Sequence, residues 1–336
     1  VHNCCKEHSS CEGEGLVPFL LFADDQSVYP VLSGNLSLLT SNYPLFSTYQ
    51  HFTTPAFFIH LFSVPVISYY ILHIQEVPME QILNLQHISY TYHTLEGETP
   101  ALSDISFSLN KGEFAAIVGP SGCGKSTLLS LICGLLPCSD GQITINGRHL
   151  KESTTNVGYM LQHDELFEWR TIYNNVILGL EIQHALTART KKRAHELLNI
   201  YGLSDFENSR PSELSGGMRQ RAALIRTLVL EPELLLLDEP FSALDYQTRL
   251  QVGDDIGQII RNEKKSALLV THDLSEAISL ADRVIVLSRR PAAIIQTIPL
   301  IFHLEEDTPM NRRNAPEFKS YFNLIWKELN QDEKSS

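Results

Sequence analysis

Hydrophobic and polar positions predict alternating strands and helices from residue 79 onward. The segment ILNLQHISYTY at 82–92 alternates between apolar and polar residues, as a strand with one buried face does, and ALSDISFSL at 101–109 repeats the pattern. Residues 113–118 form a short, almost wholly apolar run, which is typical of a parallel strand buried on both faces. Two more runs of this kind stand at 234–237 and 267–270. The pattern predicts an α/β fold with an open sheet.

Polar residues directly follow the later two apolar runs. Asp238 and Glu239 come after 234–237, and Thr271, His272 and Asp273 come after 267–270. Ligands of open α/β sheets bind outside the carboxyl ends of the strands. We therefore expect these side chains to gather at one edge of the sheet.

The segment GPSGCGKST joins the run at 113–118 to an apolar, helix-like stretch. It fits the pattern G-x-x-x-x-G-K-[ST], in the strand-then-helix setting that a phosphate-binding loop requires. Its glycines let the main chain curl so that several N–H groups point at an anion, and a helix that starts at Lys125 adds the partial positive charge of its N-terminus. Lys125 would reach the β and γ phosphates, and the hydroxyl of Ser126 would hold Mg²⁺. The predicted phosphate-binding residues are Gly119, Pro120, Ser121, Gly122, Cys123, Gly124, Lys125, Ser126 and Thr127. Within this loop we expect the Cys123 side chain to pack rather than react.

The first 78 residues differ from the rest of the chain. They contain one basic residue, Lys6, against six acidic ones, and no helical or strand period persists in them. Residues 56–73 carry no formal charge and are just long enough to cross a bilayer, but Pro65 and two histidines weaken that interpretation. The first methionine is Met79, and the regular pattern begins directly after it. We expect the native protein to start there, with 1–78 as upstream sequence read in frame or a weakly ordered extension.

Composition and charge narrow the class of protein. The chain has 336 residues, of which 43% are hydrophobic and 19% charged, as in an ordinary globular protein. Its net charge of -13 argues against a protein that grips nucleic acid, which needs clustered Lys and Arg. Six cysteines in a chain of this length do not form a disulfide framework and favour a reducing compartment.

Four further segments follow the phosphate loop in a fixed order: LSGGMRQR at 214–221, LLLLDEP at 234–240, SALD at 242–245 and THD at 271–273. Together with the loop, they resemble the nucleotide-binding subunit of an ATP-binding cassette (ABC) transporter over nearly all of residues 80–290. The resemblance implies a P-loop NTPase core of the RecA-like type with a mixed sheet and a small antiparallel β subdomain. It also implies a cassette at 79–336, with an inserted helical subdomain at about 163–215 and a short C-terminal tail at about 300–336.

The resemblance assigns roles to individual residues. Asp238 matches the aspartate that binds Mg²⁺, and Glu239 matches the carboxylate that polarises the attacking water. His272 matches the switch histidine that contacts the γ phosphate. Gln162 matches the glutamine that touches Mg²⁺ and the water, and Tyr92 matches the aromatic residue that stacks on adenine. The implied catalytic residues are Glu239, His272 and Gln162, and the implied metal ligands are Ser126, Gln162 and Asp238.

Some of these residues also have purely structural interpretations. Tyr92 fits an ordinary sheet surface. Asp238 and Glu239 could cap a strand, although adjacent carboxylates repel unless a cation compensates. Ser215, Gly216 and Gly217 fit a plain N-cap before the helix MRQRAALIRTLVL. With the resemblance, Ser215, Gly216, Gly217 and Met218 instead bind the γ phosphate of an ATP held by another subunit.

One chain carries one phosphate loop and one such signature, so the resemblance implies that two copies pack head to tail around two ATP molecules. It also implies two transmembrane permease subunits, contacted through a groove beside Gln162, and an extracytoplasmic solute-binding protein that acts through the permease. The expected location is the cytoplasmic face of the cell membrane, as a peripheral subunit. Glu168 stands where related subunits commonly have proline before tryptophan, which leaves the shape of the groove open.

Residues 281–300 and 315–329 resemble the importer branch that serves nitrate, aliphatic sulfonates and taurine. We therefore expect an ATP hydrolase that drives import of such a small solute, with the ATPase of another ABC importer or of a lipid-handling complex as the alternative. A chromosome-maintenance ATPase is excluded because only 95 residues (214 minus 119) separate Gly119 from Leu214. A translation factor would need two tandem cassettes, and a fused exporter would need about six membrane spans.

Overall fold

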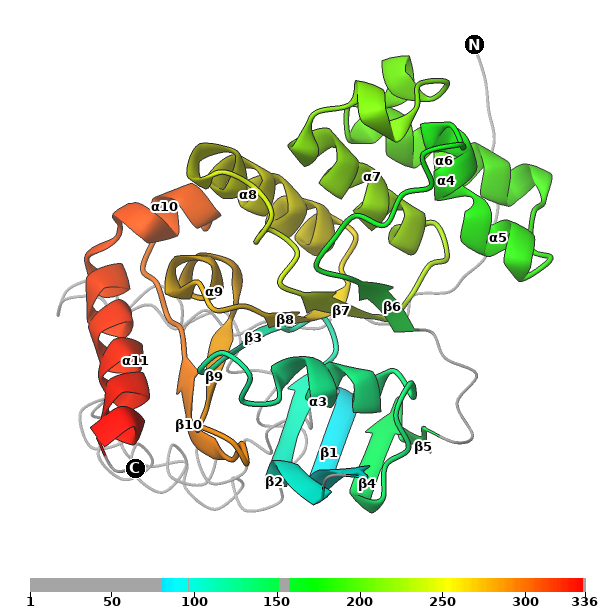
Figure 1. Cartoon of the computed structure of the whole chain (residues 1–336). Coiled ribbons are helices and arrows are strands. Elements are labelled where there is room, and N and C mark those ends of the chain that lie inside the picture. The colour runs from blue at the N-terminus through cyan, green and yellow to red at the C-terminus, as the bar shows by residue number, and fades with distance from the viewer. Residues whose placement is uncertain (1–79, 96, 151–156, 335–336) are drawn as a thin grey trace, which may run out of the picture. The chain divides into compact units, whose positions relative to one another are not determined.

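The computed structural model describes residues 80–95, 97–150 and 157–334, which form two sheets and their covering helices (Figure 1). The remaining residues, 1–79, 96, 151–156 and 335–336, lie outside the described part of the chain. The interpretations given to residues 1–78, including the apolar stretch at 56–73 and the start at Met79, fall there. The division of the chain at residue 79 stays a prediction.

The central sheet has six strands in the order β10-β9-β3-β8-β7-β6. Its strands are β3 (Phe114–Val118), β6 (Val157–Met160), β7 (Leu234–Asp238), β8 (Ser266–Val270), β9 (Arg283–Leu287) and β10 (Ile294–Pro299). Neighbouring strands are parallel except β10, which runs antiparallel to β9, so the predicted mixed sheet is confirmed. Every residue of β3, β7 and β8 is buried. Both faces are covered, which explains why these strands are continuous apolar runs.

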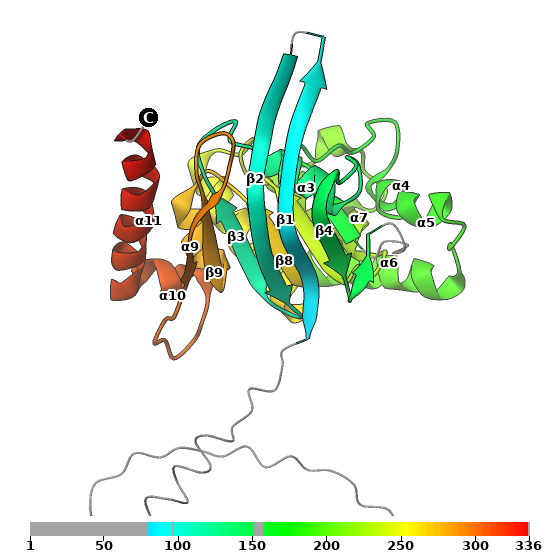
Figure 2. The ribbon, with the colours of Figure 1, turned by 90° about the horizontal axis from the view of Figure 1, so that it is seen from below.

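A second, antiparallel sheet has the order β2-β1-β4-β5 and confirms the predicted small β subdomain. It consists of β1 (Gln81–Thr94), β2 (Gly97–Asn110), β4 (Asp140–Ile145) and β5 (Arg148–His149). The β1–β2 hairpin extends well past the other strands (Figure 2). Near its tip, Tyr92 lies opposite Thr99 and Thr91 lies opposite Pro100.

Two hydrophobic clusters occupy the two faces of the central sheet. On β3, Ala115 and Ile117 point into a cluster shared with the small sheet and with α3 (Lys125–Ile132). Phe114, Ala116 and Val118 point into the other cluster. That second cluster contains the apolar faces of α7 (Gly216–Leu228), α8 (Tyr246–Asn262) and α9 (Leu274–Leu280). Helix α3 is thus sandwiched between the two sheets (Figure 1).

Between β6 and α7 the chain is mostly helical. It forms α4 (Ile172–Val176), α5 (Leu178–Ile182) and α6 (Ala188–Ile200), followed by short turns of 3₁₀ helix at Ser204–Phe206 and Pro211–Glu213. Thr187 and Thr190 form a reciprocal cap that starts α6. The guanidinium of Arg226 on α7 donates to the carbonyls of Asp164 and Glu165, which ties the loop after β6 to the helix.

The chain after β10 forms α10 (Pro309–Asn314) and α11 (Pro316–Lys334), which pack against α9. Arg312 on α10 is buried, pairs with Asp307 and donates to the carbonyl of Ala281. Within the described ranges, no helix combines the length and the apolar composition that a membrane span requires.

A buried amide holds the loop between β6 and α4 in place. Asn175 is fully buried, and its Oδ1 accepts from the N–H of Phe167 at 2.7 Å. Its Nδ2 lies 3.0 to 3.3 Å from the carbonyls of Phe167, Arg170 and Thr171.

We predict that Asn175→Ala lowers the free energy of unfolding by about 3 kcal/mol, because it leaves buried main-chain groups without partners. Urea denaturation measures this, and the half-buried neighbour gives the control variant Asn174→Ala. Equal losses in the two variants would contradict the role of the amide.

Glu276, in the first turn of α9, makes stability depend on pH. Burial raises its pKa to about 7, although Thr271 donates to its carboxyl at 2.6 Å. Between about pH 4.5 and pH 7, the folded chain therefore keeps a proton on Glu276 that the unfolded chain has released. The stability that comes from this protonated carboxyl is fully present below about pH 4.5 and is lost as the pH rises to about 7.

The side chain in Glu276→Gln cannot titrate, so this variant should not lose stability through this group as the pH rises. Between pH 4.5 and 7, the free energy of unfolding of the variant minus that of the original chain should therefore increase by up to about 3 kcal/mol. Denaturation at a series of pH values measures the difference. The neighbouring change Ser275→Ala should leave the pH dependence as it is, and a constant offset between Glu276→Gln and the original chain would contradict the prediction.

Candidate nucleotide site

The phosphate loop has the curled shape that its sequence predicts. It follows β3 and ends where α3 begins at Lys125. Gly124 has a φ of 128°, and a Cβ there would lie 2.8 Å from the Leu102 side chain and 3.0 Å from the Ala101 carbonyl. Only glycine fits such a position without strain. The Nζ of Lys125 donates to the carbonyls of Gly119 and Pro120, both at 2.9 Å, so the lysine spans the loop from inside.

A cavity of about 370 Å³ opens beside this loop. Most of the residues predicted for nucleotide and metal binding line it: Tyr92, Ser121, Gly122, Gly124, Lys125, Ser126, Thr127, Gln162, Asp238 and Glu239. Ala101 and Arg290 line it as well. Gly119, Pro120 and Cys123 do not line it. The first two face Lys125 through their carbonyls, and the Cys123 side chain is buried in the core.

Asp238 ends β7 at the floor of the cavity. Its Oδ1 accepts from the hydroxyl of Ser126 at 3.0 Å, and its Oδ2 accepts from the hydroxyl of Tyr159 at 3.1 Å. Burial raises the pKa of Asp238 above its ordinary value, while these two hydrogen bonds and the charge of Lys125 oppose the rise. A bound cation would favour the charged carboxylate further.

Glu239 follows in an unusual backbone conformation. Its φ is 46°, in the left-handed region that residues other than glycine seldom occupy, and its N–H donates to the carbonyl of Val270 at 2.8 Å. This turn aims the side chain toward the next strand end, where His272 Nδ1 lies 3.0 Å from Glu239 Oε2. Backbone strain of this kind is common where a side chain must be held in a set position at a functional site.

Gln162 and Tyr92 reach the cavity from different parts of the fold. Gln162, two residues after β6, donates from Nε2 to the hydroxyl of Ser242 at 3.1 Å. Tyr92 comes from the small sheet, and its hydroxyl lies 3.0 Å from Oγ1 of Thr127 on α3. Tyr92 is therefore more than sheet surface, because its hydroxyl contacts the phosphate loop.

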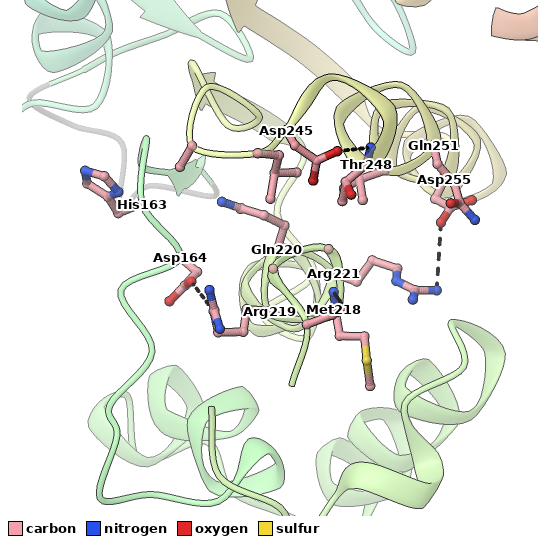
Figure 3. Close-up of a pocket in the computed structure, with 16 residues that line it drawn as sticks. His163, Asp164, Met218, Arg219, Gln220, Arg221, Asp245, Thr248, Gln251 and Asp255 are labelled. Atoms are coloured by element: carbon pink, nitrogen blue, oxygen red, sulfur yellow. Dashed lines mark hydrogen bonds and ion pairs between the residues drawn. The ribbon is translucent and has the colours of Figure 1, made fainter. Parts of the chain in front are cut away.

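The serine-glycine segment lies at a second cavity, of about 660 Å³, rather than at the first (Figure 3). Ser215 caps α7, with its Oγ 3.4 Å from the N–H of Met218, so the predicted N-cap is present. The helix begins at Gly216, two residues earlier than the sequence pattern predicts, and includes both glycines. A Cβ at Gly217 would lie 2.6 Å from the Val252 side chain, which explains the need for glycine there.

Polar and charged side chains line this second cavity and are paired across it (Figure 3). Arg219 donates to Asp164 at 3.1 Å, and Arg221 lies 3.8 Å from Asp255. The capped helix N-terminus is left facing the cavity, a setting that suits an anion. The phosphate loop and the capped end of α7 therefore lie at two separate cavities of the chain.

Sequence reasoning missed Tyr159, which contacts the cavity residue Asp238, and Arg290, which lines the cavity itself. Tyr159 lies on β6, three residues before Gln162, so its place in the strand offered a signal. Arg290 lies 165 positions after Lys125 (290 minus 125), in no recognisable motif, and no local signal could have identified it.

Comparison with known proteins agrees with this geometry. The ABC transporter family pattern matches residues 102–242. An uncharacterised ABC transporter ATP-binding protein of Bacillus subtilis is 47% identical over 75% of this chain and 97% of its own length. An aliphatic sulfonates import ATP-binding protein of Bacillus licheniformis is 39% identical over 71% of this chain and 91% of its own. A nitrate import ATP-binding protein of Synechocystis is 38% identical over 72% of this chain and 93% of its own length.

Solved structures point the same way. The chain is similar to a dimeric ATP-binding cassette bound to ADP and Pi, with 29% identity and a TM-score of 0.57, over 66% of this chain and all of that one. The predicted P-loop NTPase fold and the predicted resemblance to the nitrate, sulfonate and taurine branch are both confirmed. The chain therefore belongs to the ABC transporter family and is one of its ATP-binding, ATP-hydrolysing proteins.

Proposed function

We propose that this chain powers import of a small solute by binding and hydrolysing Mg·ATP at the phosphate-loop cavity. One observation carries the proposal: side chains from segments scattered between Tyr92 and Glu239 meet at that single cavity. They include a phosphate loop, a buried carboxylate and an adjacent second carboxylate. This is the set of parts that phosphoryl transfer to water requires.

The donor set at the cavity suits magnesium. The Ser126 hydroxyl and the Asp238 carboxylate are hard oxygen ligands that lie 3.0 Å apart, and Gln162 offers an amide oxygen beside them. These three residues would hold Mg²⁺. The ion would neutralise charge on the β and γ phosphates.

The remaining residues divide the chemistry between them. Lys125 would exchange its bonds to the loop carbonyls for the β and γ phosphates. Glu239 would orient and polarise the attacking water, and its carboxylate is kept in place by His272. In this proposal His272 also contacts the γ phosphate. It would then touch both Glu239, which activates the water, and the phosphate that is transferred. Tyr92 would stack on adenine.

The second cavity supports a composite site between two copies of the chain. Ser215, Gly216, Gly217 and Met218 line it, away from the phosphate loop. The solved cassettes to which the chain is similar are dimeric. We propose head-to-tail pairing, in which these four residues of one copy cover the γ phosphate of an ATP bound by the other. ATP closes the pair, and hydrolysis lets it open.

Relatives named for nitrate, aliphatic sulfonate and taurine import support a solute of that kind. The proposed partners are two transmembrane permease subunits and a solute-binding protein, with the chain at the cytoplasmic face of the membrane. Beyond Gln162, the ring centroids of Phe167 and Trp169 lie 4.5 Å apart with a tilt of 40° between the ring planes, and the two residues are 37% and 70% exposed. This exposed aromatic pair supports permease docking there. The alternative is an importer of another solute, as the uncharacterised Bacillus subtilis relative allows.

Glu239→Gln separates binding from turnover. The amide keeps the shape of the side chain but cannot act as a base, so ATP binding should persist while hydrolysis slows by roughly 10²- to 10⁴-fold. Phosphate release and ATP binding by calorimetry measure the two. Lys125→Ala should instead weaken ATP binding itself. Turnover that is unchanged in Glu239→Gln would refute the assignment of the base.

Ser215→Glu tests the composite site. A carboxylate there would repel the γ phosphate of the partner's ATP, while the phosphate-loop cavity of each monomer stays intact. In a Glu239→Gln background, Mg·ATP should produce dimers by size-exclusion chromatography, and adding Ser215→Glu should abolish them without changing ATP binding by monomers. Ser204→Glu, at an exposed serine in the 3₁₀ turn after α6, is the control and should still dimerise. Undiminished dimers in the Ser215→Glu variant would contradict head-to-tail pairing.

A further inference from the structure

Arg290 lies in the turn between β9 and β10 and reaches the nucleotide cavity from a part of the chain that no motif marks. Among the described residues that line this cavity, it and Lys125 are the two with permanent positive charge. Lys125 is buried and points at the loop carbonyls, whereas Arg290 is exposed at the rim. The two cations therefore differ in exposure and in what they contact.

The turn that carries Arg290 is fixed to the small sheet. Two residues further on, Ala292 is fully buried, and its N–H donates to the carbonyl of Ala101 at 2.9 Å. The carbonyl of Ala292 accepts from the N–H of Ser103 at 2.8 Å. Through these two bonds Ala292 pairs with β2 as a short extra strand would. Backbone pairing therefore fixes the position of the turn.

The side chain of Arg290 is also held. Its Nε donates to the carbonyl of Pro100 at 3.0 Å. Pro100 lies opposite Thr91 in the β1–β2 hairpin, directly beside the pair formed by Tyr92 and Thr99. The guanidinium thus lies beside the part of the hairpin that carries Tyr92, the residue proposed to stack on adenine.

No carboxylate among the described residues neutralises the charge of Arg290. Within the described part of the chain its one hydrogen bond is that from Nε, and no carboxylate pairs with it. Arg283, on the strand before it, instead pairs with Glu113. The terminal nitrogens of Arg290 keep their donors, in a planar arrangement that suits phosphate and ribose oxygens.

We propose that Arg290 binds the nucleoside monophosphate end of the nucleotide. Its terminal nitrogens donate to oxygens of the α phosphate or the ribose, while Lys125 and the metal ligands hold the β and γ phosphates. This inference rests on the proposed nucleotide site. ATP and ADP share the contacted part, so Arg290 contributes equally to the affinity for both.

The test compares Arg290→Ala, Arg290→Lys and the original full chain by titration calorimetry with ATP and with ADP. A lost charged hydrogen bond should raise both dissociation constants by the same factor, roughly tenfold. Arg290→Lys should raise the dissociation constants less, because lysine keeps the positive charge but lacks the planar pair of terminal N–H donors. In hydrolysis assays KM should rise by a similar factor while kcat stays unchanged, since the contact forms equally in the ground and transition states. Arg289→Ala, at the neighbouring exposed arginine that does not line the cavity, is the matched control.

Three outcomes would overturn the inference. Dissociation constants of Arg290→Ala equal to those of Arg289→Ala would remove Arg290 from the site. A loss of affinity for ATP but not ADP would place its contact at the γ phosphate. A lower kcat with unchanged KM would point to the reacting groups instead. If the original chain fails to bind ATP, or if Lys125→Ala binds it as well as the original does, the proposed function itself fails, and this is distinguishable from failure at Arg290 alone.

Discussion

The side-by-side packing of β3, β8 and β7 is the constraint on which the site depends. Parallel neighbours lie about 4.8 Å apart, and their carboxyl ends meet at one edge. Each strand ends in a different part of the machinery: β3 in the phosphate loop, β7 in Asp238 and Glu239, and β8 in His272. The hydrogen bond from Ser126 to Asp238 and the contact between His272 and Glu239 follow from this spacing. The burial that holds the strands together therefore also assembles the chemistry.

The charged side chains at the site are placed in a way that suits a nucleotide. Asp238 and Lys125 are almost fully buried, and burial disfavours the charged form of the aspartate. Beside them, Glu239 is kept in a left-handed backbone conformation that its side chain does not favour. Arg290 adds an exposed cation that no carboxylate in the described part of the chain pairs with. Such features cost stability in the empty protein and are offset when a polyphosphate and a cation bind together, as proposed.

The two cavities explain why one copy of the chain is an incomplete enzyme in this proposal. The phosphate loop and the capped end of α7 line different cavities, and each presents main-chain N–H groups at a helix N-terminus. The glycines of the second segment pack tightly against α8 and the loop before it. Its geometry is therefore tied to the sheet that carries Glu239, and closure between two copies would join both elements.

The sequence by itself determined the strands β1, β2, β3, β7 and β8, the loop and most of the cavity lining, because these depend on local patterns. Continuous apolar runs specify buried parallel strands, and the glycine spacing of residues 119–124 specifies a curled main chain. Tertiary structure alone decided the strand order, the contact of Tyr159 with Asp238 and the approach of Arg290 to the nucleotide cavity. It also extended α7 to Gly216, since packing of both glycines against neighbouring side chains offsets their poor helix propensity. These outcomes arise from contacts between residues far apart along the chain, and such contacts leave no periodic trace in the sequence.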